Sequence, residues 1–153
     1  IDEAITTYLK RKYNLLVGET TAEEVKLRIG SAIVLEKIEE MDVKGRDNVT
    51  GLPRAVAITS TEITEAIRPA LLAIIGAAKG VLEETPPELA SDIIDKGIVM
   101  SGGTSLLRNL DRLMTELMGV PCHVAEDALL CVVRGTGVAL ENIDLYKRSI
   151  VKR

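Results

Sequence analysis

The chain has 153 residues and a net charge of -4, and 46% of its residues are hydrophobic. That length suits one domain or two small subdomains, and the core must be aliphatic because only 2% of residues are aromatic. The acidic balance and the scarcity of aromatic rings argue against nucleic-acid binding. No secretory signal pattern opens the chain, and no apolar run reaches the roughly 18 residues that span a bilayer.

The N-terminal part is predicted to hold two helices. Residues 2–12 carry apolar side chains at helical spacing, and the basic run Lys10–Lys12 lies at the C-terminal end, where positive charge suits the helix dipole. Thr21 and Glu24 have the spacing of a capping box, so a second helix is expected to begin there and to stop at Gly30.

A hairpin is expected next. Apolar and acidic residues alternate weakly over 34–44, which indicates a half-exposed strand. Turn-forming residues over 46–53 predict a loop, and residues 55–59 predict a second strand that is antiparallel to the first.

Capping and breaking signals divide the following segment into three predicted helices. The first opens at a capping box formed by Thr59 and Glu62. Because proline is tolerated in the first turn of a helix but not inside it, a break is expected before Pro69. The helix that Pro69 opens is apolar nearly all round and should pack on two sides. The three expected helices cover residues 59–67, 69–84 and 88–94.

The most informative stretch is an apolar run that stops at two glycines. Ile98-Val99-Met100-Ser101 precedes Gly102-Gly103, and Thr104-Ser105 then opens a helical pattern that reaches Met118. Glycine lets the backbone approach a ligand closely, and a helix N-terminus favours an anionic group. From these residues alone, an ordinary turn without a ligand is the favoured interpretation.

The glycine turn belongs to a predicted strand–helix–strand crossover. Strands over 97–101 and 122–125 flank a helix that Gly119 ends, and such crossovers are right-handed and place the strands in parallel. Two strands are few for a parallel sheet, which usually has more strands and cover on both faces. We therefore expect the chain to be part of a larger structure whose missing strands precede residue 1.

A last helix is expected after the second of these strands, capped by Glu126 or Asp127. It carries Gly135 and Gly137, each of which costs about 1 kcal/mol in a helix relative to alanine, so a backbone or ligand is expected close by. The basic residues 146–153 are expected to fray.

The two cysteines and the single histidine offer no metal site. Cys122 and Cys131 are nine residues apart, a spacing that does not suit zinc, and we expect buried free thiols in a reducing compartment. His123 is expected to be packed or solvated.

Together these segments resemble the C-terminal half of the MreB/Mbl family of bacterial actins, which determine cell shape. The resemblance covers nearly the whole chain. The runs 86–89 (Pro-Pro-Glu-Leu) and 106–111 (Leu-Leu-Arg-Asn-Leu-Asp) are typical of MreB-like proteins among actins, and chaperone-type and sugar-kinase relatives of the same fold lack the first run. The other matching segments are 2–5, 13–19, 21–26, 29–32, 45–46, 51–54, 89–93, 97–103 and 125–127.

The resemblance implies an α/β fold, namely domain II of an actin-like ATPase. Residues 1–15 would be a bridging helix of the inner subdomain, and residues 16–83 would form the smaller α+β outer subdomain, which is IIB-like. Residues 84–153 would form the partial, ribonuclease-H-like inner subdomain, which is IIA-like.

The resemblance also implies ATP as cofactor, with Mg²⁺ in the full-length protein. The adenosine would be held from this side by one helix and by the glycine turn. Glu23 and Lys26 share a helix face and could bond the ribose and adenine, although without the family an exposed salt bridge worth a few tenths of a kcal/mol is the simpler interpretation. The residues implied in cofactor binding are Glu23, Glu24, Lys26, Gly102, Gly103, Thr104 and Ser105.

Two differences between this sequence and the family pattern limit which family properties can be expected of the chain. Thr104 stands where the family usually has a third glycine, and its Cβ narrows the approach to the nucleotide. The family's phosphate-binding loops, catalytic carboxylate, metal-binding acid and membrane-binding segment all lie outside this sequence. We therefore expect no catalytic or metal-binding residue here, weak or absent ATP binding, and neither ATP turnover nor normal polymerisation by this chain alone.

The function implied is that of a filament-forming protein of the bacterial cytoplasm, associated with the membrane as a full-length filament, that organises peptidoglycan synthesis. Its partners would be other copies of itself and other cytoskeletal, division or cell-wall-synthesis proteins. The alternative is an interaction module that binds another cytoskeletal or division protein without nucleotide, through residues 34–59 or Lys10–Lys12. A solvated face is the simpler interpretation of those surfaces.

Overall fold

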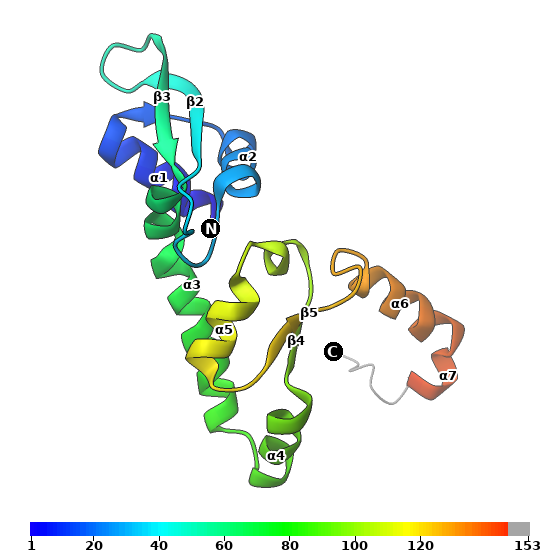
Figure 1. Ribbon diagram of the computed structural model, residues 1–153. Helices are drawn as coiled ribbons and strands as arrows, with labels where there is room; N and C mark the ends of the chain where they lie inside the picture. Colours follow the sequence, from blue (N-terminus) through cyan, green and yellow to red (C-terminus); the bar gives the residue numbers. More distant parts are fainter. Residues whose placement is uncertain (147–153) are drawn as a thin grey trace.

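The computed structural model describes residues 1–146 and contains two units joined by one long helix (Figure 1). The upper unit holds α1 (Asp2–Tyr13), α2 (Glu19–Ile29) and a sheet of β1 (Leu15–Leu16), β2 (Glu40–Asp47) and β3 (Pro53–Thr59). Helix α3 (Ser60–Glu83) leads from β3 to the lower unit. That unit holds α4 (Pro87–Lys96), β4 (Ile98–Met100), the 3-10 helix η1 (Gly103–Leu106), α5 (Leu110–Met118), β5 (Cys122–Val124), α6 (Cys131–Glu141) and α7 (Ile143–Tyr146).

Helix α1 follows the prediction, whereas α2 begins three residues earlier than predicted. The N-cap of α2 is Gly18 and makes no side-chain cap, so the predicted capping box at Thr21 and Glu24 is wrong. The stop at Gly30 is confirmed, since its N–H donates to the Lys26 carbonyl at 3.0 Å. A Cβ on Gly30 would lie 2.3 Å from that carbonyl oxygen, which explains why glycine stands there.

The predicted hairpin is present, but its first strand is shifted. Residues 34–39 form no strand, and β2 pairs in antiparallel register with β3 from Glu40 opposite Thr59 to Arg46 opposite Pro53. Exposed and covered residues alternate along β2, with Val43 buried, as expected of a half-exposed strand. The pairing partner, rather than the local pattern, determines where β2 begins.

Helix α3 begins at the predicted capping box of Thr59 and Glu62 but then continues through Pro69. The predicted break is therefore wrong. Pro69 is exposed, whereas Ile67 and Leu71 are buried and α3 packs on both α1 and α5, so packing outweighs the lost hydrogen bond. The expected two-sided packing is also wrong, because Leu72, Ile74 and Val81 remain exposed.

In the lower unit, β4 and β5 are parallel as predicted, with Ile98 opposite Cys122. The helix expected from residue 105 begins only at Leu110, because Asn109 adopts a left-handed conformation with φ 59°. Gly119 ends α5 as predicted, with φ 74°. The capping expected of Glu126 or Asp127 is wrong, since α6 begins at Cys131 after the N-cap Leu130.

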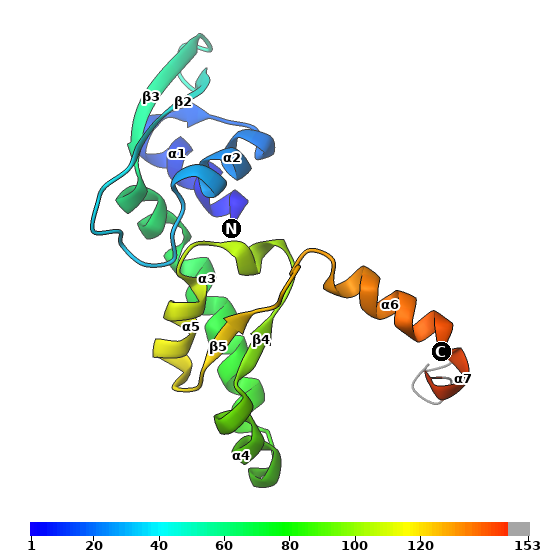
Figure 2. The same ribbon diagram turned by 45° about the vertical axis from the view of Figure 1, so that its right-hand side comes forward.

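Helix α6 extends away from the β4–β5 sheet in both views (Figures 1 and 2). No atom of the described residues lies within 4 Å of a Cβ built on Gly135 or Gly137, so the close neighbour expected there is not found among them. Both cysteines are free; Cys122 is buried, but Cys131 is only half-buried, against the prediction. His123 is exposed. The tail expected to fray lies, beyond residue 146, outside the described residues.

The fully buried core belongs to the first half of the chain. The largest apolar side chains with less than 2% exposure all lie between residues 5 and 71: Ile5, Leu9, Leu15, Val25, Val43, Ile58, Ile63, Ile67 and Leu71. Among residues 1–146, none of the helices is long and apolar enough to cross a membrane.

Candidate functional site

The first predicted nucleotide-binding element, α2, presents Glu23 and Glu24 to solvent. Glu24 pairs with Arg28 one turn on, at 2.8 Å. Lys26 is largely covered and its Nζ lies 2.9 Å from the Asp2 carboxylate of α1. The simple Glu23–Lys26 salt bridge is therefore not formed, and Glu23 remains the acidic group of this face that could accept ribose hydroxyls.

The second predicted element, the glycine turn, is anchored by hydrogen bonding to the rest of the lower unit, and the space beside Gly102 is free of atoms of the described residues. The Gly102 N–H donates to the Ala128 carbonyl at 2.8 Å, and the buried Ser105 hydroxyl donates to the Gly102 carbonyl at 2.6 Å. Gly102 has φ 85°, and a Cβ on it would meet no atom within 4 Å. Thr104 and Gly103 are exposed.

The turn does not present the N-terminus of a long helix, contrary to the sequence-based expectation. It opens the four-residue η1, and α5 starts only after the left-handed Asn109. The Ser105 hydroxyl is engaged within the turn. What the turn offers a ligand is therefore exposed backbone beside two glycines, with Thr104 at its edge.

Arg108, which follows η1, links the two predicted elements. Its guanidinium donates to the Arg28 carbonyl at 2.7 Å and to the Gly30 carbonyl at 3.1 Å, at the C-terminal end of α2. The same group forms a bidentate pair with the Glu39 carboxylate, at 2.7 and 2.9 Å. The hydrogen bonds from Arg108 lower the pKa of Glu39. Single-residue reasoning missed Arg108, although it lies in the Leu-Leu-Arg-Asn-Leu-Asp run that carried the family resemblance.

A second polar cluster lies on the upper unit around Glu62, away from the glycine turn. Its carboxylate accepts from Lys12 at 2.6 Å and from the Tyr13 hydroxyl, and it completes the Thr59 cap. Partial burial opposes ionisation of Glu62, but the hydrogen bonds from Lys12, Tyr13 and Thr59 outweigh it and lower the pKa to about 2. These bonds tie α1 to the start of α3.

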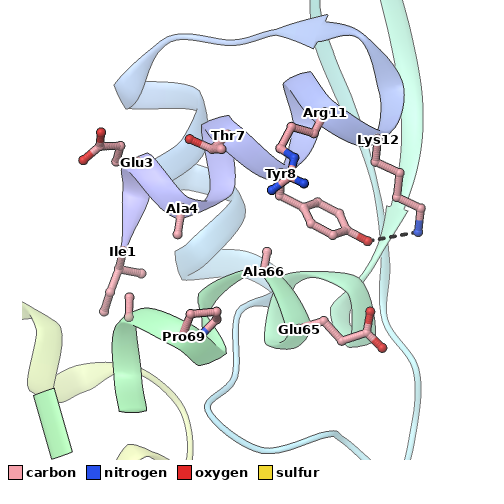
Figure 3. A pocket seen from close by; sticks show the side chains of 11 residues that line it. Ile1, Glu3, Ala4, Thr7, Tyr8, Arg11, Lys12, Glu65, Ala66 and Pro69 are labelled. Carbon is pink, nitrogen blue, oxygen red and sulfur yellow. Dashed lines mark hydrogen bonds between the residues drawn. The ribbon is translucent and has the colours of Figure 1, made fainter. Parts of the chain in front are cut away.

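A groove of about 760 Å³ lies between α1 and α3 (Figure 3). Ala4 and Thr7 of α1 and Ala66 and Pro69 of α3 line it, and charged side chains stand at its rim, including Arg11 from the basic run. A smaller hollow of about 460 Å³ lies beside Ile1 and Glu19. Neither hollow is lined by the predicted nucleotide-binding residues. Within residues 1–146 there is no group of three or more His, Cys, Asp or Glu side chains that could hold a metal ion.

Comparison with known sequences identifies close relatives. A family model described as MreB/Mbl protein matches residues 1–148. The cell shape-determining protein Mbl of Bacillus cereus is 49% identical over 150 residues, covering 97% of this chain and 45% of the relative. MreB of Escherichia coli is 50% identical over 145 residues, covering 95% of this chain and 42% of the relative. The chain thus spans less than half the length of these relatives.

Solved structures agree with this. MreB5 of Spiroplasma citri bound to ADP has a TM-score of 0.88 and 39% identity, over 93% of this chain and 43% of that one. The same protein bound to AMPPNP has a TM-score of 0.88 and 37% identity. The MamK double helical filament, at 17% identity and a TM-score of 0.66, shares the fold. The chain therefore belongs to the MreB/Mbl family and has part of the actin-like fold.

Proposed function

We propose that this chain forms one side of a nucleotide site, and part of the polymer surface, of an ATP-dependent cytoskeletal filament that controls rod cell shape by organising peptidoglycan synthesis. The observation that carries the proposal is the close likeness of nearly the whole chain to MreB5 in its ADP-bound and AMPPNP-bound structures. The filament would lie in the bacterial cytoplasm, with membrane contact made through segments outside this sequence.

The residues fit a nucleotide in part. The open space before Gly102 and the exposed Glu23 carboxylate suit the close approach of a nucleoside. Lys26, by contrast, is paired with Asp2, and Ser105 is engaged within the turn. We therefore assign direct contact to Glu23, Gly102 and Gly103, and a supporting role to Lys26 and Ser105.

The division of labour follows the same proposal. Residues 16–83 would be the outer subdomain and residues 84–153 the inner one. The resemblance placed residues 1–15 with the inner subdomain, but α1 packs on α2, β1 and α3, so we assign it to the outer subdomain. No residue here is assigned a catalytic role, and Mg²⁺ and the phosphates would be held by segments outside this sequence. A phosphate-release assay on this chain should show no magnesium-dependent turnover, and clear turnover would contradict the assignment.

Nucleotide binding is tested by substitution in the glycine turn. A Cβ on Gly103 would touch only Leu129, at an ordinary 3.4 Å, so Gly103→Ala should fold normally while placing a methyl group against the ligand. Amide chemical shifts during titration with Mg-ADP should show weak binding by the parent chain and weaker binding by Gly103→Ala. Gly76→Ala, at an exposed position of α3, is the matched control. Equal binding by all three would remove the turn from the site.

Thr104 permits a test in the opposite direction. Its exposed Cβ stands where the family resemblance implies a third glycine, so Thr104→Gly should strengthen binding by giving the nucleotide more room. Unchanged or weaker binding would mean that Thr104 does not border the site.

Protein partners are the second part of the proposal. Self-association is expected, because α6 exposes Val132, Val133 and Leu140 on a helix that stands away from the sheet. Light scattering should report a mass above that of the monomer. The groove between α1 and α3, with Arg11 at its rim, favours contact with another cytoskeletal, division or cell-wall protein, and Arg11→Glu is the variant that would weaken it.

A further inference from the structure

The C-terminal end of α2 is held by a residue that lies 78 positions further along the chain. The last carbonyl groups of a helix have no partner within the helix and need an outside donor. Arg108 supplies it, donating from Nη2 to the Arg28 carbonyl and from Nε to the Gly30 carbonyl. One side chain thus satisfies two carbonyl groups at the C-terminal end of α2 and attaches that end to the segment after η1.

The guanidinium cannot turn away easily, because a third group fixes it. Glu39 accepts from both terminal nitrogens, at 2.9 and 2.7 Å, in the planar two-point geometry that arginine and carboxylate share. The main chain adds a further contact, since the Ala32 N–H donates to the Arg108 carbonyl at 2.8 Å. Next to it, the Asn109 amide donates to the Ser31 hydroxyl at 3.0 Å.

We call these contacts of Arg108 and Asn109 with the end of α2 and with Glu39 the Arg108 seam. The Arg108 seam lies between α2 and the glycine turn, the two elements proposed to hold the nucleoside. Arg108 comes two residues after η1, which the glycine turn opens, and η1 is the part of the lower unit that faces α2 (Figure 2). The turn is itself anchored, through the Gly102 N–H and the Ser105 hydroxyl. Any movement of Arg108 relative to α2 would therefore change the distance from the turn to Glu23.

We propose that Arg108 is a positioning residue of the nucleotide site, which fixes the spacing between α2 and the glycine turn without touching the nucleotide. The nucleotide part of this inference rests on the proposed function, whereas the fastening of the two elements does not. Lysine cannot replace arginine here, because a single ammonium group cannot reach the Glu39 carboxylate and both carbonyl groups in one plane.

The fastening is tested by a distance measurement that needs no nucleotide. Spin labels are placed on cysteines introduced at Leu27 of α2 and Leu106 of η1, which are 69% and 51% exposed, in a background with Cys122→Ser and Cys131→Ser. The parent and the matched control Arg112→Lys, an exposed arginine of α5, should give one narrow distance distribution. Arg108→Lys should broaden it. A distribution as narrow as that of the control would overturn the inference.

A second variant keeps the test decisive if Arg108→Lys does not fold. Glu39→Gln leaves the bonds from Arg108 to the two carbonyl groups in place but removes the charge that fixes the guanidinium, so its distribution should be intermediate in width. A Glu39→Gln distribution identical to that of the parent would contradict the role given to this pair.

The nucleotide part is tested by titrating the same folded variants with a fluorescent ADP analogue. Coupling between two sites in a protein typically changes affinity by about fivefold or more. The Arg108→Lys variant should therefore bind the ADP analogue at least about fivefold more weakly than the Arg112→Lys variant. Unchanged affinity together with a broadened distance would overturn the positioning role. If the parent itself binds no analogue, the proposed function fails, and the distance measurement still decides whether Arg108 fastens the two elements.

Discussion

The upper and lower units are both built from helices and strands that carry apolar side chains, yet they bury those side chains to different extents. Ile5, Leu9 and Val25 of the upper unit are completely buried, whereas Leu129, Val132 and Leu140 of the lower unit are 66–73% exposed. The strands β1, β2 and β3 and the helices α1, α2 and α3 enclose the first core. The strands β4 and β5 offer little sheet for α6 to pack on (Figure 1). Apolar content therefore produces a core only where enough partner surface lies within the same unit.

This contrast bears on the proposed site, because each unit contributes one element. Helix α2 stands on the well-packed unit, and the glycine turn stands on the sparsely packed one. The hydrogen bonds of Arg108 fasten the segment beside the glycine turn to the end of α2, and so hold part of the lower unit against the well-packed upper unit. The predictions below test how far the two units differ.

The largest effect is expected from the same substitution made in each unit. Leu9→Ala should lower the free energy of unfolding by about 2–5 kcal/mol, because it leaves a cavity in a closed core. Leu140→Ala, in exposed α6, should change it by less than about 0.5 kcal/mol. Urea unfolding followed by circular dichroism measures both. Equal losses would show that α6 is packed as tightly as α1.

Next in size is the polar link between α1 and α3. Glu62→Gln should lower the free energy of unfolding by about 1–3 kcal/mol, since Lys12 and Tyr13 lose their charged partner. Because the pKa of Glu62 falls from 4.5 to about 2 on folding, its contribution is complete above pH 4.5 and is lost as the pH falls to about 2. Unfolding free energies measured across that range should drop in the parent more steeply than in the variant. Parallel curves would contradict the link.

A smaller effect, of opposite sign, is expected where α3 joins the units. Pro69→Ala restores an N–H inside a helix, which favours the folded state, but it also frees the unfolded chain, which opposes folding. The net result should be a free energy of unfolding that is higher by about 1–2 kcal/mol. Thermal unfolding is the measurement. A lower midpoint would indicate that Pro69 supports the groove or that α3 is bent there.

The smallest effects separate a helical glycine from a turn glycine. Gly76→Ala, at an exposed position of α3, should stabilise the protein by roughly 0.5–1 kcal/mol. Gly51→Ala should destabilise it by about 1–2 kcal/mol, because Gly51 has φ 75° at the hairpin turn. If chemical unfolding showed that both substitutions change the free energy of unfolding in the same direction, one of these two backbone conformations would be wrong.

Local signals predicted the elements whose ends are chemically marked. The capping box at Thr59, the stop at Gly119 and the parallel pairing of β4 with β5 were all available from spacing. The continuation of α3 through Pro69 was not, because it depends on the packing of Ile67 and Leu71. The start of β2 at Glu40 likewise depends on its partner strand.

The residues of the proposed site remain a prediction, and the contacts that connect them were not predicted. The resemblance implied the residues of α2 and of the glycine turn, whose nucleotide contacts remain predictions. It could not reveal that Lys26 pairs with Asp2, or that Arg108 joins the two elements across 78 positions, because both contacts arise only on folding. Long-range polar contacts of this kind leave no periodic pattern in a single sequence.

Our central claim is that α2 and the glycine turn form one side of a nucleotide site across two unequally packed units. Hydrogen exchange of this chain, with and without millimolar Mg-ADP, tests that claim most directly. We predict slow exchange in α1, α2 and the first half of α3, faster exchange in α5 and α6, and added protection by nucleotide at Gly102–Ser105 and along α2. A nucleotide footprint confined to the groove between α1 and α3, or no footprint at the glycine turn, would contradict the account.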